Sequence, residues 1–431
     1  MNRRKALIVG DDAALGRPIE RNDVVSRKKR LLAVAVAVAA GVMIAGCAPS
    51  GGSGGSSTPG GTYHVWMSLG VTGGVATVAK ANVAGMQAAI DAVNDDGGID
   101  GKKVELSVSD DQLDPTKAVT NLQTELQSHK IDLAIAGNTS NVANALAPVL
   151  SRDKILAFTQ ASAVELNDPS KFPYLFQSTV LEPYNVSSML SEIESKGYKK
   201  IALLVANDAL GQSTAAEYKK QTAAGGFTLS TETFAPTDLD MTAQLQRLQA
   251  SDPDVLVINA FGSVLGYILK GRTALGWDVP TIGANATANG NNLGALSTPA
   301  DWTNMSLQAI YVNTEEGAST SAAKDFVARL KKNGAALDVP LHQYAVFWDI
   351  LHIVKAAVEK AHSTDAPAVA KAIVGLGKVS PDTGATLTFA VERYTEKEHA
   401  WTWTDDELQS GKVLKYVGAG PIEDGVIKSA H

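Results

Sequence analysis

The segment Lys200-Ile201-Ala202-Leu203-Leu204-Val205-Ala206 is a nearly uninterrupted apolar run of strand length. Such a run is typical of a parallel strand whose sheet is covered by helices on both faces. The sequence downstream predicts helices at about 211–224, 242–250 and 264–274, and strands at 227–234 and 254–258. Because strands that alternate with helices form βαβ units with right-handed crossovers, this half of the chain is expected to build a parallel sheet.

The chain on either side of this half continues the alternation. Strands are expected at 64–69, 103–109, 131–136 and 155–158, and helices at about 78–93, from Asp114 onward and at 143–150. Asp114 is placed to cap its helix and Pro115 to occupy the first turn. Further helices are predicted near 322–332, 344–361 and 367–376, and short strands around 387–389, 400–403 and 413–417. These are too many strands for one ordinary sheet, so we expect two α/β lobes.

Composition and charge exclude several classes of protein. Of the 431 residues 45% are hydrophobic and 19% charged, which indicates a globular protein of two or three domains. The first 30 residues hold nine basic and four acidic side chains, so the net charge of −7 leaves −12 on the chain from Cys47 onward. An acidic body argues against nucleic acid as a partner. Cys47 is the only cysteine, so no internal disulfide forms.

The N-terminal region is expected to be an export signal. The basic cluster Arg27–Arg30 precedes the apolar run Leu31–Met43, which is shorter than the roughly 20 residues of a membrane-spanning helix. Residues 1 to about 24 lie ahead of an ordinary signal, and we interpret them as an extraneous extension from a misassigned start codon. Residues 1–46 are therefore expected to be the signal region with this extension.

The sequence Ile44-Ala45-Gly46-Cys47 resembles the lipobox of bacterial lipoproteins. That resemblance implies cleavage before Cys47 and acylation of its sulfur and new amino group, and two or more acyl chains make a stable membrane anchor. The Gly/Ser/Pro-rich residues that follow form, with Cys47, a flexible tether at 47–61. We therefore expect the folded body at the outer face of the cytoplasmic membrane.

The body resembles a known family over residues 62 to 420. One stretch, Ala92 to Leu106, contains Asn94 and the pair Gly97-Gly98, and it is followed by Asp110-Asp111 and by Asp114-Pro115-Thr116-Lys117-Ala118-Val119. Later matches are Asn207 to Gln212, Asp254 to Ile258 and Thr281 to Asn285. In this order and spacing, the motifs resemble the leucine/isoleucine/valine-type solute-binding lipoproteins of ABC importers, which have the type I periplasmic-binding-protein fold.

The resemblance implies two doubly wound parallel-sheet lobes joined by three hinge crossovers near 177–182, 308–314 and 385–400. Lobe 1 is then expected at 62–178 and 312–388, and lobe 2 at 179–311 and 389–431. The ligand cleft lies between the lobes, where the carboxyl ends of the strands face each other and closure buries a solute. The implied partners are a small-molecule ligand and ABC permease and ATPase subunits, and we expect a monomer without a cofactor.

The resemblance also implies ligand positions. Members of the family hold an amino-acid carboxylate with hydroxyls and backbone N–H groups of two loops, which here are Thr139-Ser140-Asn141 and Ala161-Ser162-Ala163. Both loops precede expected helices, whose N-termini favour anions. Ser140 and Ser162 are also suited to be plain helix caps, and one residue can serve both purposes.

Four expected ligand positions depart from the family pattern. Family tyrosines align with Val78, Leu210 and Phe261, and the acidic residue that grips a ligand ammonium aligns with Asn285. Because a buried ammonium without a carboxylate is costly, the pocket is expected to favour a small aromatic or branched aliphatic carboxylate, or a neutral amphiphile, over a free amino acid. A shift of the alignment by one residue, or a charge from Glu165 or Asp208, would restore amino-acid binding.

The sequence contains no motif for metal binding or for catalysis. Asp110, Asp111 and Asp114 are interpreted as structural carboxylates rather than a calcium loop, and the seven histidines show no metal-binding spacing, so no metal site is predicted. No nucleophile elbow or phosphate-binding loop occurs, so an enzyme is not expected. A ligand-sensing receptor lipoprotein that serves a signalling partner is the alternative function.

Overall fold

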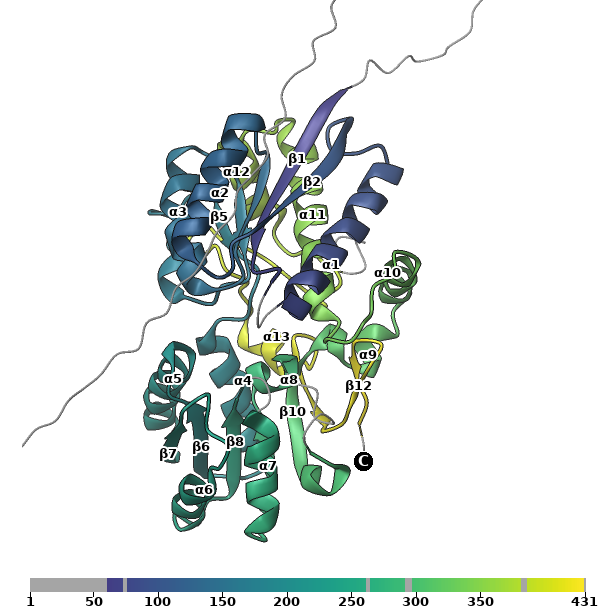
Figure 1. Cartoon of the computed structure of the whole chain (residues 1–431). Coiled ribbons are helices and arrows are strands. Elements are labelled where there is room, and N and C mark those ends of the chain that lie inside the picture. The colour runs from purple at the N-terminus through teal and green to yellow at the C-terminus, as the bar shows by residue number, and fades with distance from the viewer. Residues whose placement is uncertain (1–59, 73–75, 261–263, 291–296, 381–385, 430–431) are drawn as a thin grey trace, which may run out of the picture. The chain divides into compact units, whose positions relative to one another are not determined.

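The computed structural model describes residues 60–429 apart from 73–75, 261–263, 291–296 and 381–385. Two sheets, one wholly parallel and one parallel except for an edge strand, account for most of it, and each has helices on both faces (Figure 1). Among the described residues, none of the helices combines the length and apolar character needed to cross a membrane.

The first sheet has the strand order β2-β1-β3-β4-β5, with all neighbours parallel. Its strands are β1 (Gly60–Leu69), β2 (Lys102–Asp110), β3 (Leu133–Ala136), β4 (Ala157–Thr159) and β5 (Leu175–Gln177). One face packs against α1 (Ala76–Asp95), α11 (His342–Ala361) and α12 (Ala366–Leu376), and the other against α2 (Pro115–Ser128) and α3 (Ser140–Arg152).

Strand β1 shows how the pattern of side chains builds these two layers. Tyr63, Val65 and Met67 are buried against α1 and α11, whereas Trp66 is buried against α2 and α3. Successive side chains of a strand point to opposite faces, so an apolar run supplies both cores at once. The sequence predicted such double coverage for the run Lys200–Ala206, and the structure shows it in both sheets.

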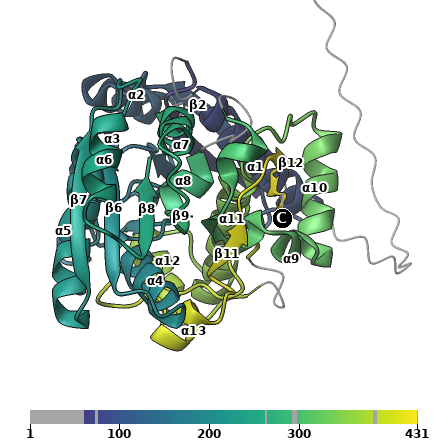
Figure 2. The ribbon, with the colours of Figure 1, turned by 90° about the horizontal axis from the view of Figure 1, so that it is seen from below.

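The second sheet has the order β11-β10-β9-β8-β6-β7, and Figure 2 shows β7, β6, β8 and β9 side by side. Its strands are β6 (Lys200–Ala206), β7 (Thr228–Phe234), β8 (Val255–Asn259), β9 (Thr281–Gly283), β10 (Met305–Ile310) and β11 (Leu414–Gly418), of which β11 alone runs antiparallel to its neighbour. Helices α4 (Glu182–Ser195) and α5 (Ala209–Gly225) pack on one face. Helices α6 (Thr242–Gln249) and α7 (Val264–Ala274) pack on the other.

Short elements connect and border the two lobes. They are η1 (Val164–Leu166), α8 (Asn285–Gly290), η3 (Pro299–Trp302), η4 (Tyr311–Asn313), α9 (Glu315–Ala318), α10 (Ser321–Lys332), α13 (Asp405–Gln409), β12 (Ile422–Glu423) and β13 (Val426–Ile427). The chain leaves the first lobe after β5, returns to it after β10 through η4, and enters the second sheet again at β11.

The local signals of the first lobe behave as the sequence predicts. The Asp114 carboxylate accepts the N–H groups of Thr116 at 2.7 Å and Lys117 at 3.2 Å, so it caps α2. Gly98 has φ of +84°, and a Cβ on it would lie 1.9 Å from the Lys102 carbonyl oxygen, so only glycine fits the turn between α1 and β2. Asp111 accepts bonds from the Ser68 hydroxyl and the Leu113 N–H, as expected of a structural carboxylate.

Two of the three short strands expected near the C-terminus do not form. The N–H groups of Leu387 and Thr388 donate to the buried Asp349 carboxylate at 2.6 and 2.8 Å instead of to a neighbouring strand. Residues 400–403 form only a single parallel bridge, between Ala400 and Gln177, because their tryptophans are packed into the core. The third expected strand is β11.

The segment after residue 388 packs on the first lobe before it reaches the second sheet. Phe389, Trp401 and Trp403 share one hydrophobic core with the residues of β1, α1 and α11. His399 accepts the N–H of Gln177 at 2.7 Å through its carbonyl oxygen, which holds the segment along β5. The chain reaches the second sheet only at β11.

Candidate ligand-binding cleft

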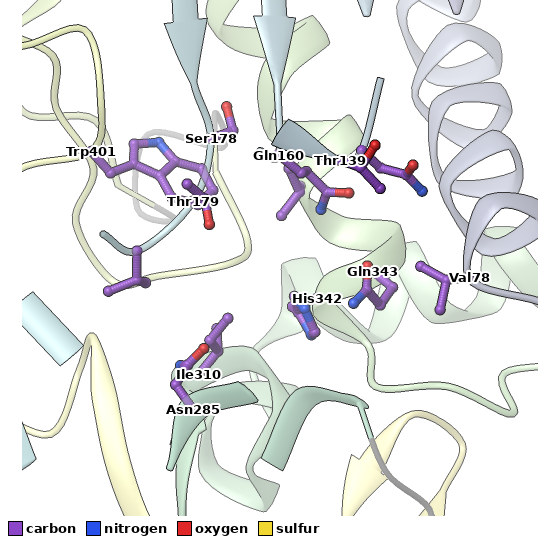
Figure 3. A pocket seen from close by; sticks show the side chains of 13 residues that line it. Val78, Thr139, Gln160, Ser178, Thr179, Asn285, Ile310, His342, Gln343 and Trp401 are labelled. Atoms are coloured by element: carbon purple, nitrogen blue, oxygen red, sulfur yellow. The ribbon is translucent and has the colours of Figure 1, made fainter. Parts of the chain in front are cut away.

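A cavity of about 320 Å³ lies at the carboxyl ends of the first-sheet strands (Figure 3). Its lining comes from the segments that follow β3, β4 and β5, from α1 and α11, and from Asn285 and Ile310 of the second lobe. The lining residues are Val78, Asn138, Thr139, Gln160, Ser178, Thr179, Val180, Asn285, Ile310, His342, Gln343, Val346 and Trp401. Strand ends of open α/β sheets are where such folds bind ligands, and this volume is that of a small-molecule site.

Among the described residues that line the cavity, none carries a formal charge at neutral pH. Of these described lining residues His342 alone has a titratable side chain, and burial lowers its pKa to about 3, so its imidazole is neutral. A charged group of a solute would therefore meet dipoles rather than a counter-ion. This limits the solutes that bind without a large desolvation cost.

Thr139 and the first turn of α3 form the anion-favouring side of the cavity. Thr139 is the N-cap residue of α3, but its hydroxyl makes no capping hydrogen bond. The Thr139 hydroxyl oxygen and the Asn138 amide oxygen are both buried and have no partner within the protein. The free N–H groups of a helix N-terminus attract anions, so this corner can hold a carboxylate without an arginine.

His342 presents a defined hydrogen-bond donor to the cavity. The Asn313 amide oxygen accepts the backbone N–H of His342 at 2.8 Å, so the Asn313 Nδ2 lies on the other side, 3.1 Å from His342 Nδ1. Because Nδ2 donates only, Nδ1 accepts, and the proton of the neutral ring resides on Nε2. The ring is thus set to donate from Nε2 to an acceptor atom.

Trp401, Ile310 and Val346 give the cavity apolar surface, and Ser178 and Thr179 lie close to Trp401 (Figure 3). Trp401 is 1% exposed and packs edge-on against Phe389 at 4.9 Å between ring centroids, which fixes the plane of its indole ring. Ile310 and Val346 line the same cavity. An aromatic face with branched aliphatic neighbours suits a hydrocarbon group, while the polar groups described above hold a polar head.

Asn285 is positioned by the core of the second lobe. Its backbone N–H donates to the Gln308 amide oxygen at 3.0 Å, and Gln308 Nε2 in turn donates to the Asn185 carbonyl oxygen at 2.8 Å. A neighbouring small void is lined by Asn285 and by Glu182, a carboxyl whose pKa is raised by burial and whose oxygen accepts the Thr214 hydroxyl at 2.9 Å. Glu182 does not line the larger cavity.

The structure brings some of the sequence-predicted site residues together and separates others. Val78, Thr139 and Asn285 line the cavity, whereas Ser140 and Asn141 begin α3 beside it and Leu210 lies in the first turn of α5. Ala161, Ser162 and Ala163 follow the lining residue Gln160, and the carbonyl oxygens of Ala161 and Ala163 accept bonds from Gln177 Nε2 at 2.8 and 3.0 Å. Phe261 and the lipidation candidate Cys47 lie outside the described residues.

The two carboxylates considered as substitutes for a missing charge have other partners. Glu165 accepts a hydrogen bond from Asn144 at 3.0 Å, and Asp208 caps α5 by accepting the N–H of Gly211 at 2.8 Å. Neither is among the residues that line the cavity.

Sequence reasoning missed His342, Gln343, Gln160 and the pair Ser178-Thr179. The first two begin α11, a helix that is more than 200 residues from β1 in sequence, so no local motif links them to the cleft. Gln160, Ser178 and Thr179 follow directly on β4 and β5, and their position after buried strands was a usable signal. Trp401 falls in the strand expected at 400–403, but in the structure it lines the cavity.

Comparisons with known proteins identify the class. The family model described as periplasmic binding protein matches residues 64–401. A Leu/Ile/Val-binding protein homolog from Brucella melitensis is 25% identical over 74% of this chain and 85% of its own length. The Leu/Ile/Val-binding protein BraC3 from Rhizobium johnstonii is 28% identical over the same shares.

Solved structures share the fold. A periplasmic binding protein type 1 from Bordetella pertussis superposes with a TM-score of 0.69 at 20% identity, covering 86% of this chain and 98% of its own. A branched-chain amino acid transporter substrate-binding protein from Streptococcus pneumoniae, solved with isoleucine, gives 0.64 at 18% identity, covering 83% and 99%.

The chain therefore belongs to the periplasmic binding protein family and has the type I fold. It is a solute-binding protein and not an enzyme, as its curated relatives are also named binding proteins.

Proposed function

We propose that this chain is the extracytoplasmic substrate-binding lipoprotein of an ABC importer, anchored through lipid on Cys47. It captures a small amphiphile that carries a carboxylate or neutral polar head on a branched aliphatic or aromatic body, and delivers it to the permease. The observation that carries the ligand class is the cleft itself, whose described lining combines polar and apolar side chains but has no charged one.

The polar head of the solute would lie between Thr139 and His342. An unpartnered hydroxyl, the N-terminus of α3 and an imidazole Nε2–H are donors for a carboxylate. The hydrocarbon body would pack on Trp401 and Ile310. These groups come from both lobes and from the segments that cross between them, so closure about the hinges would bury the solute.

The ligands named for the relatives agree with the proposed solute in size and in their carboxylate, but they also carry an ammonium group. The curated relatives are named for leucine, isoleucine and valine, and two similar structures were solved with isoleucine and with leucine. Their shared ligands combine a carboxylate with a branched side chain, which this cleft suits. Their ammonium group would face Asn285, whose amide does not neutralise a cation.

A pair of compounds that differ only in the amino group tests the ligand class. L-Leucine and 4-methylpentanoate have the same carbon skeleton and carboxylate, and benzoate adds an aromatic body. We expect calorimetry at pH 7 to show tighter binding of 4-methylpentanoate or benzoate than of leucine. Tight leucine binding with no response to either acid would contradict the proposed ligand class and leave the family assignment intact.

The lipid anchor has its own test. In cells, Cys47→Ala should move the protein from the membrane fraction to the soluble envelope or culture fraction, and mass spectrometry should find acyl groups only on the unchanged chain. Ser50→Ala in the same tether is the matched control and should remain anchored. An unmodified thiol at position 47 in the membrane-bound protein would refute the anchor.

A further inference from the structure

Two histidines and a glutamate meet on the first lobe, outside the ligand cleft. His64 lies on β1, Glu125 lies near the end of α2, and His129 is the C-cap residue of that helix. The alternation of β1 turns His64 to the same face as Trp66, which α2 and α3 cover. Near this point Asp132 precedes β3, and its N–H donates to the His64 carbonyl oxygen at 3.0 Å.

The three side chains converge on one oxygen atom. His64 Nε2 lies 2.7 Å and His129 Nδ1 3.2 Å from Glu125 Oε1. The Ser107 hydroxyl donates to the same oxygen at 2.7 Å and lies 3.0 Å from His64 Nε2. One ligand atom from each of His64, Glu125 and His129 lies within 4.8 Å of the other two.

We propose that His64, Glu125 and His129 bind a transition-metal dication such as Zn²⁺. Two imidazole nitrogens and one carboxylate oxygen are a ligand set that zinc takes at distances of about 2.0–2.2 Å, with tetrahedral geometry completed by a fourth ligand. The Ser107 hydroxyl or a water molecule is suited to that fourth position. The ion would take the place of the hydrogen bonds that Glu125 Oε1 now accepts from Ser107 and His64.

The surroundings provide space for an ion. An open pocket of about 590 Å³ adjoins His64, His129 and Ser107, and its two carboxylates, Glu105 and Asp132, are matched by Lys102 and Lys130. Lys130 is already paired with Asp132 at 2.7 Å.

Binding requires one side chain to move. The rings of His64 and His129 are stacked, with centroids 4.6 Å apart and planes 17° from parallel, whereas a bound ion lies near the plane of each imidazole. The side chain of His64 is 11% exposed and that of Glu125 15%, so they are held in place, while that of His129 is 54% exposed and has room to rotate. His64 and Glu125 are thus ligands held in position, and His129 completes the site by rotating its side chain toward the ion.

A bound ion at this site would stabilise the first lobe. The ion would link the first half of β1 to the end of α2. Because an ion that binds only the folded chain stabilises it by mass action, zinc should raise the thermal midpoint of the first lobe.

Zinc chloride titrated into the tag-free protein by calorimetry tests the proposal, with Cys47→Ser in all samples so that the thiol cannot bind the metal. We expect one ion per chain, and loss of at least about tenfold in affinity for His129→Asn and for Glu125→Gln, since even changes around metal ligands cost 10–100-fold. His362→Asn is the matched control, because His362 is also an exposed C-cap histidine, on α11, and should bind zinc as the parent does.

X-ray absorption at the zinc edge should show two imidazole ligands in the parent and one in His129→Asn. Far-ultraviolet circular dichroism checks that each variant is folded. No saturable binding below millimolar zinc, or equal affinity in the parent, His129→Asn and Glu125→Gln, would overturn the proposal. None of these results depends on the solute in the cleft.

Discussion

Asn313 and His342 are joined by two hydrogen bonds, one from the His342 backbone N–H to Asn313 Oδ1 at 2.8 Å and one between Asn313 Nδ2 and His342 Nδ1 at 3.1 Å. Asn313 ends η4, where the chain returns from the second sheet, and His342 begins α11 in the wall of the cleft. The crossing segment between the lobes therefore determines which ring nitrogen of His342 carries the proton.

Asn313→Ala should weaken both the fold and ligand binding. It leaves the buried N–H and Nδ1 of His342 without partners, at a cost of about 1–3 kcal/mol in the free energy of unfolding, and it frees the ring to change tautomer. Thermal unfolding measures the loss of stability, and calorimetry with 4-methylpentanoate or benzoate, whichever binds the parent more tightly, measures the loss of affinity. Asn333→Ala, at an exposed asparagine bonded to Asp91, is the control, and an equal loss in both variants would contradict this role for Asn313.

Thr139→Val should reduce affinity without reducing stability. The Thr139 hydroxyl has no partner in the protein, so its removal costs the fold little, while loss of a hydrogen bond to the solute should weaken binding about tenfold.

Thr159→Val is the contrasting variant. The Thr159 hydroxyl donates to the Gly137 carbonyl oxygen and accepts the Ala161 N–H, so its loss should destabilise the fold by about 1–3 kcal/mol. Unchanged affinity in Thr139→Val, measured by calorimetry, would remove Thr139 from the binding site.

Asn285→Asp should turn the preference toward amino acids. A carboxylate here supplies the missing partner of an ammonium, and it is tolerated at the start of α8 because helix N-termini favour negative charge. We expect calorimetry to show a gain of about tenfold or more for L-leucine and a loss for 4-methylpentanoate. Asn285→Ala removes the amide without adding a charge and so serves as the control. An equal gain in leucine affinity in Asn285→Ala would argue against the electrostatic explanation.

Asp349 and Glu392 should make stability fall as pH rises. Burial raises the pKa of Asp349 to about 6, and burial together with the Asp349 charge raises the pKa of Glu392 well above its usual value. The folded chain therefore keeps protons that the unfolded chain releases near pH 4, so their stabilisation is full below pH 4 and is lost as pH rises through the folded values.

Glu392→Gln should remove the Glu392 part of this dependence. The slope of the unfolding free energy between pH 5 and 8 should become less negative by up to about 1.4 kcal/mol per pH unit. Denaturant unfolding at several pH values measures it, with the exposed Glu396→Gln as control. A slope identical to that of the parent would show that Glu392 does not hold its proton in the folded state.

Gly85→Ala should destabilise the protein although alanine favours helices. A Cβ at Gly85 on α1 would lie 2.1 Å from the Tyr344 carbonyl oxygen on α11, so the two helices would have to separate, at a cost of about 1–3 kcal/mol. Gly375→Ala on α12 meets only the Lys360 ammonium at 3.4 Å and should be neutral or stabilising by up to about 1 kcal/mol. Equal thermal midpoints for the two variants would contradict this close approach.

The sequence by itself determined the layers of this protein. Buried strands such as Lys200–Ala206, the Asp114 cap and the Gly97-Gly98 turn depend on neighbours within a few residues, so their patterns can be read locally. The strand expected at 131–136 ends shortly before Thr139, which lines the cleft, whereas the position of Asn285 was implied by the family resemblance.

Only the tertiary structure decided which distant groups meet. Leu387 and Thr388 have a strand-like sequence, but their N–H groups find the Asp349 carboxylate on α11, and Trp401 reaches the cleft through a segment held against β5. His64 lies 61 residues from Glu125, and Asn313 29 residues from His342. No periodicity records such pairs, because a hydrogen bond or a shared ion depends on distance in the folded chain and not on spacing along it.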